Sequence, residues 1–280
     1  VVEHTCLIIL SVRDQFVLKD RKNDFIHANW VTLPDQTKYI CTQGPLTETC
    51  EDFWHMCYTE QCSIILMLCN FTEGSDREKC AVYFPHKDAK DEKERETMKF
   101  GEYTITRTKT LAEPDVEGVT TTILEVKKKN EKKTWSIKHV LMTSWPDNLA
   151  PVEAEPVLKL WRWTKKNCED KPVVVHCSAG VGRTSTFVGF ELTFHRIAVD
   201  PKLSMMDIVK ELRSMRYQSV QSHVQFLYMH VLVLEYLAQE KIIKRPEGGF
   251  IAEYKKHAQK KLEKREKTGE PDGRGAKDEA

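Results

Sequence analysis

The stretch VVVHCSAGVGRTSTF, residues 173–187, joins an apolar run to a helical pattern through a short loop of small residues. Residues 173–176 show no polar alternation before the histidine, which is typical of a short buried strand. Over 184–198 the apolar residues recur at the period of an amphipathic helix. Between the two lies a loop that begins with Cys177 and ends with Arg183. This order predicts a loop at the edge of a sheet, leading directly into a helix.

The residue types of this loop are suited to holding a phosphate group. Glycines and small side chains let several backbone N–H groups turn toward one point at a helix N-terminus, where they can bind an anion. Arg183 adds a planar guanidinium that matches two phosphate oxygens. The same donors favour the thiolate of Cys177, so the loop combines a nucleophile with a phosphate site. The pattern predicts phosphoryl transfer through a cysteine. The expected phosphate-contacting residues are Ser178, Ala179, Gly180, Val181, Gly182 and Arg183.

Composition excludes several other classes of function. The 280 residues carry a net charge of +1 and are 40% hydrophobic, which suffices for one large core. A charge so near zero provides no field that would attract nucleic acid or an anionic membrane. No apolar run approaches the roughly 20 residues of a transmembrane helix, and the first residues lack the basic region of a signal peptide. We therefore expect no nucleic-acid partner and no membrane segment in this chain.

The nine cysteines form an odd set without a C-x-x-C pair, and many lie in apolar surroundings. This favours reduced, buried thiols and a reducing compartment such as the cytoplasm over a disulfide framework. No spacing of cysteine and histidine resembles a zinc site. We expect neither a metal nor a cofactor.

The periodicity of the sequence predicts an α/β (α+β) fold, with a twisted mixed sheet flanked by helices and the phosphate-binding loop between a central strand and a helix. A catalytic domain is expected over 1–245. Residues 246–280 are predicted to be a charged, disordered tail, helical and solvated where it begins. The predicted strands are 38–42, 63–69, 79–84, 101–108, 119–126, 134–142 and 173–176, and the predicted helices are 47–61, 154–166, 184–198, 204–215 and 222–239.

The segment HCSAGVGRT resembles the signature loop of the cysteine-dependent protein tyrosine phosphatases, and the wider sequence is similar to their phosphotyrosine-specific branch. The similar segments run in family order from about residue 22 to residue 240. They read NDFIHANWV, KYICTQGPL, DFWHM, KCAVYFP, SWPD, the signature loop and VQSHVQF. The resemblance implies hydrolysis of phosphotyrosine in proteins through a phosphocysteine intermediate.

The resemblance also implies catalytic residues outside the loop. Asp147, in TSWPDNLAP, would protonate the departing tyrosine oxygen and then activate water for the second step. Gln221 would position that water. Gln225 is the second glutamine of the same segment, although it could equally serve only to close a capping box with Ser222.

Further residues match supporting positions of the family. Thr184 would donate a hydrogen bond to the departing sulfur, and His176 would help to hold the thiolate; the alternative for His176 is an ordinary buried histidine at a strand end. For the charged positions, a plain structural role is an equally open reading. They are Glu73 as partner of Arg183, Lys79 as contact of the loop that carries Asp147, and Arg213 and Arg216 as braces of the cysteine loop.

The sequence departs from the family pattern around the mouth of the expected pocket. The N-terminal phosphotyrosine-recognition segment, with its Asn-Arg-Tyr stretch, is not found, and Phe16 is the nearest early aromatic residue. Leu149 and Gln218 stand where relatives often carry glycine. Two other functions therefore stay open at this point: a phosphotyrosine-binding module with little turnover, and a dual-specificity phosphatase with a shallower pocket.

Overall fold

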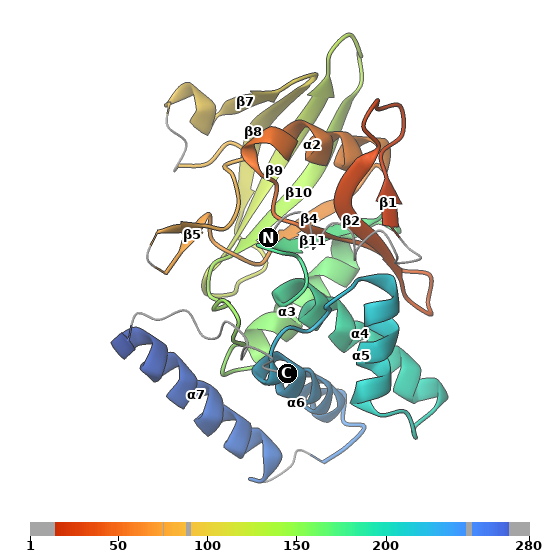
Figure 1. The fold of residues 1–280 in the computed structure, drawn as a ribbon, viewed down its shortest axis with the longest axis vertical. Coiled ribbons are helices and arrows are strands. Elements are labelled where there is room, and N and C mark those ends of the chain that lie inside the picture. Colours follow the sequence, from red (N-terminus) through yellow and green to blue (C-terminus); the bar gives the residue numbers. More distant parts are fainter. Residues whose placement is uncertain (1–14, 75, 88–90, 245–247, 269–280) are drawn as a thin grey trace, which may run out of the picture.

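A nine-stranded mixed sheet forms the centre of the computed structural model, which describes residues 15–74, 76–87, 91–244 and 248–268 (Figure 1). The strand order is β1-β2-β3-β11-β4-β10-β9-β8-β7. Neighbours among β3, β11, β4 and β10 pair in parallel, and the other neighbours pair antiparallel. The strands are β1 Gln15–Val17, β2 Phe25–Thr32, β3 Lys38–Gln43, β4 Ile64–Met67, β7 Thr97–Phe100, β8 Tyr103–Leu111, β9 Val119–Lys128, β10 Thr134–Met142 and β11 Val173–Cys177, while β5 Thr72–Glu73 and β6 Arg77–Glu78 form a separate hairpin.

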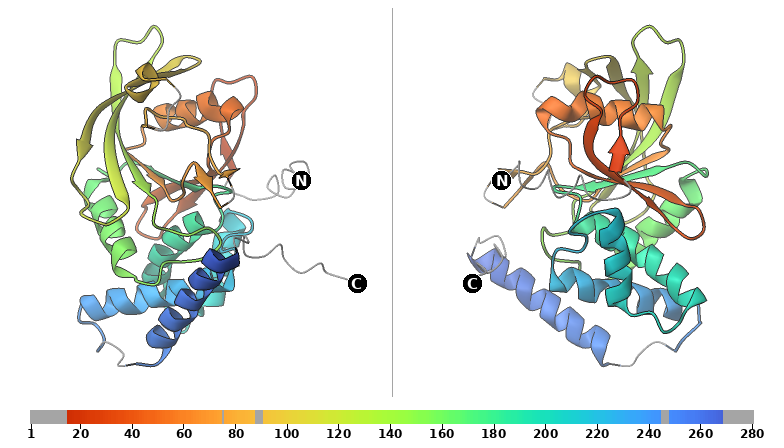
Figure 2. Two further views of the ribbon diagram at one scale, coloured as in Figure 1. Left: turned by 90° about the vertical axis from the view of Figure 1, so that its left-hand side faces the viewer. Right: turned by 45° about the vertical axis from the view of Figure 1, so that its right-hand side comes forward.

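Helices flank this sheet, as the sequence predicted. Helix α2 lies near β7 and β8, whereas α4 packs against β11 and β3 and α5 against β2 (Figures 1 and 2). The helices are α2 Cys50–Thr59, α3 Glu155–Asn167, α4 Arg183–Val199, α5 Met205–Met215, α6 His223–Gln239 and α7 Phe250–Thr268, with short 3-10 turns at Thr47–Thr49 and Lys93–Arg95. None of the helices in the described ranges is both long and apolar enough to cross a bilayer.

Strand β11 sets the position of the cysteine loop. All five of its residues are buried, and it pairs in parallel with β3 on one side and β4 on the other. It ends at Cys177, and α4 begins at Arg183. The intervening loop therefore lies at the carboxyl edge of the parallel strands, where α/β sheets usually carry their sites.

The prediction of a strand over 79–84 is wrong. Backbone N–H groups of this segment donate to loop carbonyls instead of a sheet ladder, as in the bonds from Lys79 to Phe71 and from Ala81 to Pro45. Its aromatic residues are buried in the core all the same, which is why the segment has the composition of a strand.

The sequence does not predict strand β2, because two polar residues interrupt its apolar pattern. His27 and Asn29 lie within it, and both face the guanidinium of Arg216. Arg216 Nη2 is 3.3 Å from His27 Nδ1, and Arg216 Nη1 is 2.6 Å from Asn29 Oδ1. The strands β1 and β7 are short, and β7 falls in a charged stretch that suggests an exposed connection.

The prediction for the tail is corrected over 250–268: the chain forms helix α7 over this whole range, and the helix is packed on the domain instead of solvated. Its residues Ile251, Tyr254 and Ala258 are buried, so this helix packs against the domain on one face although most of its length is charged. The rest of the tail, 269–280, and most of the N-terminal segment, 1–14, lie outside the described residues.

Two further expectations can be compared with the fold. The eight described cysteines are unpaired, and seven of them are buried, as expected of reduced thiols. Phe16 is buried in β1 and packs on Trp30 with ring centroids 5.3 Å apart, so it belongs to the core.

Candidate active site

The carbonyl groups of the cysteine loop are all bonded to groups outside it. The Ser178 carbonyl accepts from the Gly44 N–H, and those of Ala179 and Gly180 accept from the Arg216 guanidinium. The carbonyl of residue 181 accepts from the N–H of residue 220, and the carbonyl of residue 182 accepts from the N–H of residue 186. No N–H of 178–183 donates to any described residue, so these amides remain available to bind an anion.

Gly180 is required by the path of this loop. Its φ is +68°, in the left-handed region, and a Cβ at this position would lie 2.0 Å from the Thr42 carbonyl oxygen. The loop therefore rests directly on the end of β3, where only glycine leaves enough room.

Arg183 is 1% exposed and its guanidinium is held in place by Glu73 of β5. Nη1 lies 2.6 Å from Oε1 and Nη2 3.0 Å from Oε2. Burial acts to lower the pKa of Arg183, but the hydrogen bond to Glu73 and nearby acidic groups outweigh it and raise that pKa. The side chain is therefore a fixed, permanent positive charge next to the cysteine.

The acid loop, residues 143–151, is folded over the cysteine loop. Arg183 Nη2 donates to Asp147 Oδ1 at 3.0 Å, and Lys79 Nζ donates to Oδ2 at 2.6 Å. Trp145 is fully buried, and its carbonyl accepts from Arg183 Nη1. Burial acts to raise the pKa of Asp147, but the Arg183 charge and the Lys79 hydrogen bond outweigh it and lower that pKa.

Gln225 links the acid loop to the segment that carries Gln221. Its Oε1 accepts from the Gln221 backbone N–H at 3.0 Å, and its Nε2 donates to the Leu149 carbonyl at 3.5 Å. Ser222 caps α6 through the Gln225 backbone N–H only. The side chain of Gln225 is thus engaged with the two loops, and the capping-box alternative does not account for it.

Behind Cys177 lies a buried chain of three side chains, of which the sequence predicts a role for His176 but not for Tyr83 or His139. Tyr83 Oη is 2.7 Å from Nε2 of both His176 and His139. Because His176 Nδ1 contacts the Cys177 carbonyl at 3.1 Å, that nitrogen carries the proton and Nε2 accepts from Tyr83. Burial lowers the pKa of His176 to about 4, so the imidazole is neutral and positions the Cys177 backbone.

Two other predicted supports differ in their contacts. Arg216, fully buried, binds the loop carbonyls directly, whereas Arg213 donates to the carbonyls of Ser219 and Val220 one segment away.

The Thr184 hydroxyl is buried and has no hydrogen-bond partner among the described residues, so the predicted bond to the Cys177 sulfur is not formed in this structure.

Four of the six predicted catalytic residues, Cys177, Arg183, Asp147 and Gln221, line one pocket of about 170 Å³, whereas Thr184 and His176 do not line it. Its lining comes from the cysteine loop, the acid loop, the segment before α6, and Lys79. The lining residues are Lys79, Asp147, Asn148, Cys177, Ser178, Ala179, Arg183, Gln221 and Gln225. The pocket thus combines a thiol, two cations, a carboxyl group and the free backbone N–H groups of the cysteine loop.

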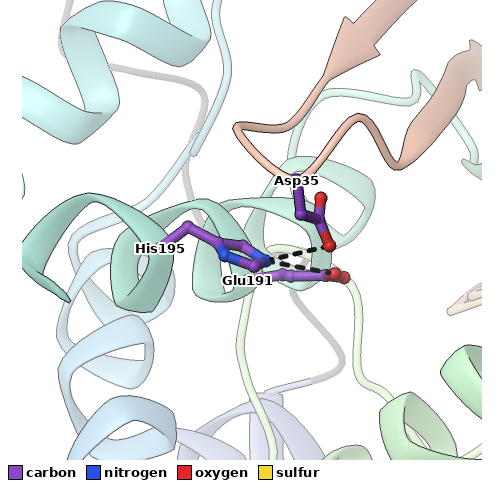
Figure 3. A group of neighbouring side chains, drawn as sticks. All are labelled: Asp35, Glu191 and His195. Carbon is purple, nitrogen blue, oxygen red and sulfur yellow. Dashed lines mark ion pairs between the residues drawn. The ribbon is translucent and has the colours of Figure 1, made fainter. Parts of the chain in front are cut away.

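A second cluster of ionisable groups joins Asp35, in the turn between β2 and β3, to Glu191 and His195 of α4 (Figure 3). His195 Nε2 is 3.4 Å from Asp35 Oδ2 and 3.8 Å from Glu191 Oε1. Lys165 Nζ lies 2.7 Å from Glu191 Oε1 and 3.3 Å from Asp35 Oδ2. Because this ammonium already supplies the positive charge between the carboxylates, the cluster is a structural ion-pair network.

Comparison with known proteins agrees with this geometry. A family model described as protein-tyrosine phosphatase matches residues 7–235. Tyrosine-protein phosphatase non-receptor type 20 of Rattus norvegicus is 31% identical over 226 residues, covering 78% of this chain and 50% of its own length. Receptor-type tyrosine-protein phosphatase C of Homo sapiens is 32% identical over 220 residues, covering 78% of this chain and 16% of its own length.

The same likeness extends to solved structures. The structure of PTPN18 in complex with HER2-pY1196 phosphopeptides superposes with a TM-score of 0.68 at 25% identity, covering 79% of this chain and 76% of that one. The chain belongs to the protein-tyrosine phosphatase family. It spans half the length of the rat relative and a smaller share of the human one.

Proposed function

We propose that this chain hydrolyses phosphotyrosine in proteins through a phosphocysteine intermediate. The observation that carries the proposal is the shared pocket of Cys177, Arg183 and Asp147, a nucleophile, a phosphate-binding cation and a proton donor lining one small space. The family membership supports the same reaction, and the phosphopeptide complex of PTPN18 supports a phosphotyrosine substrate.

In the first step the Cys177 sulfur attacks phosphorus and the bond from phosphorus to the tyrosine oxygen breaks. The electron pair stays on that oxygen, which takes a proton from Asp147. The free amides of 178–183 and the Arg183 guanidinium hold the other phosphate oxygens. A phosphate beside Arg183 would offset the positive charge that lowers the pKa of Asp147, so substrate binding itself favours the protonated acid.

In the second step water displaces the sulfur and inorganic phosphate leaves. Gln221 positions the water, and the Asp147 carboxylate takes its proton. The buried, unpartnered hydroxyl of Thr184 is suited to donate to the departing sulfur, since a buried hydroxyl without a partner is costly. The two hydrogen bonds of the Gln225 side chain fix the position of Gln221 relative to the acid loop.

The reaction requires a reduced Cys177, and the unpaired, mostly buried cysteines support a reducing compartment such as the cytoplasm. In that setting the chain would remove phosphotyrosine marks that serve in signal transduction.

The test is hydrolysis of a phosphotyrosine peptide by the purified chain, compared with Cys177→Ser and Asp147→Ala variants whose folding is checked by circular dichroism. We expect turnover by the wild type, none by Cys177→Ser, and a loss of roughly 100-fold or more for Asp147→Ala. Intact mass after rapid acid quenching should reveal a phosphate adduct on the wild type alone. Turnover no higher in the wild type than in Cys177→Ser would refute the proposal.

A further inference from the structure

Helix α7 lies along the acid loop and the residues that follow it. Side chains of α7 reach this segment at three points over about 16 Å of helix, given the rise of an α-helix. Tyr254 Oη donates to the Pro151 carbonyl at 2.7 Å, Lys255 Nζ pairs with Glu153 Oε2 at 2.6 Å, and Arg265 Nη1 donates to the Asp147 carbonyl at 2.7 Å. The last of these contacts is made to the proposed general acid itself.

The amphipathic spacing of α7 explains why Arg265 points toward the domain. Residues 251, 254, 258, 262 and 265 recur at intervals of three and four, and so share one face of the helix. Tyr254 anchors this face by stacking on Tyr228 of α6, whose other ring contact is with Trp145 of the acid loop. Arg265 therefore continues the buried face of α7 at its acid-loop end.

An open space lies between α7 and the acid loop at this end. A cavity of about 1170 Å³ separates α7 from the loop, lined on the helix side by Leu262, Arg265 and Glu266 and on the loop side by Trp145, Pro146 and Asp147 among others. Side chains do not fill this space, and the hydrogen bond from Arg265 spans it to reach the backbone of the acid.

We propose that Arg265 is a positioning residue for Asp147. Lys79 and Arg183 hold the two carboxylate oxygens, while Arg265 holds the backbone carbonyl of the same residue. When a phosphate engages Arg183, the carboxyl group loses one of its tethers, and the backbone contact still keeps it over the pocket. Arg265 thus maintains the acid within reach of the leaving oxygen without touching substrate. This inference rests on the proposed phosphatase activity.

The test exploits the fact that only a basic leaving group needs the proton. For the full chain, kcat/KM is measured with a phosphotyrosine peptide and with an aryl phosphate whose phenol carries strong electron-withdrawing groups. We expect Arg265→Ala and Arg265→Gln to lose roughly ten-fold on the peptide and little on the activated ester, and Arg265→Lys to recover much of the loss. Lys256→Ala removes the same charge from the opposite, exposed face of α7 and should match the wild type on both substrates.

Two results would overturn the inference. One is an unchanged kcat/KM in Arg265→Ala and Arg265→Gln on both substrates. The other is an equal loss on both, which would indicate a general effect on the fold, to be compared with the melting temperature of each variant. A wild type without turnover on either substrate would instead count against the proposed function, so the two failures are distinct.

Discussion

Glu73 and Arg183, 110 positions apart in the chain, form a two-point ion pair in which both side chains are less than 10% exposed. Breaking such a pair leaves an uncompensated buried charge, which typically costs about 3–5 kcal/mol. We expect Glu73→Ala to lower the free energy of unfolding by this order and to reduce kcat/KM, because Arg183 loses its orientation. Urea denaturation and peptide hydrolysis measure the two effects.

The matched control is Lys210→Ala, which breaks the exposed pair of Lys210 with Asp207. Exposed pairs are worth at most about 1 kcal/mol of stability, and neither Lys210 nor Asp207 lines the pocket. If Glu73→Ala destabilised the chain no more than Lys210→Ala, the structural importance of the buried pair would be disproved.

Gly180→Ala should abolish activity, because the new methyl group would meet the Thr42 carbonyl at 2.0 Å. The loop can relieve this clash only by moving its amides away from the phosphate position. Gly248→Ala separates the steric effect from the backbone effect. Gly248 has nearly the same φ, +69°, and its added Cβ would meet no atom of a non-adjacent described residue within 4 Å. We expect Gly248→Ala to cost about 1 kcal/mol in thermal unfolding and to leave turnover unchanged. Equal activity in the two variants would contradict the argument.

Much of this arrangement could be predicted because local signals coincide with it. The run ending at Cys177, the small residues after it and the helical period from Arg183 each specify local structure, and the structure joins them in that order. Only the family resemblance implies that Asp147 and Arg183 share one site. Nothing in their separate segments specifies a long-range contact.

What the sequence did not reveal depends on tertiary partners. Strand β2 carries polar residues because Arg216 needs acceptors, so its alternation is hidden. Tyr83 lies in a buried segment whose backbone bonds go to loops, and its role emerges only where it meets His176. For α7 the sequence predicts a helix but not its packing: the apolar spacing from Ile251 is present, and the high charge of the segment obscures it.

His27→Gln should flatten the loss of stability at low pH. Burial and the neighbouring Arg216 charge lower the pKa of His27 to about 4, against about 6.5 in the unfolded chain. Between these values the unfolded state binds more protons, so the wild type loses stability as pH falls, by up to about 1.4 kcal/mol per unit from this group. From pH 7 to pH 5 the variant should lose about 2 kcal/mol less than the wild type in urea titrations. An identical loss in both would show that His27 does not titrate on unfolding.

Lys79→Met should move the pH dependence of the general acid. Lys79 donates to Asp147 Oδ2 at 2.6 Å and, with Arg183, lowers the pKa of Asp147 against the effect of burial. Without the ammonium that pKa rises, so Asp147 keeps its proton to higher pH. The limb of the kcat/KM profile on which activity falls as Asp147 ionises should therefore shift to higher pH, even though the maximum decreases.

The Asp147→Asn variant identifies that limb, because the amide cannot ionise and the limb should vanish. Lys256→Met, on the exposed face of α7, removes an equal charge at a distance and should leave the limb in place. A shift of the limb to lower pH in Lys79→Met, or none at all, would mean that the contact between Lys79 and Asp147 is not kept in the working enzyme. In that case Arg183 and Arg265 would set the charge of the acid before substrate binds.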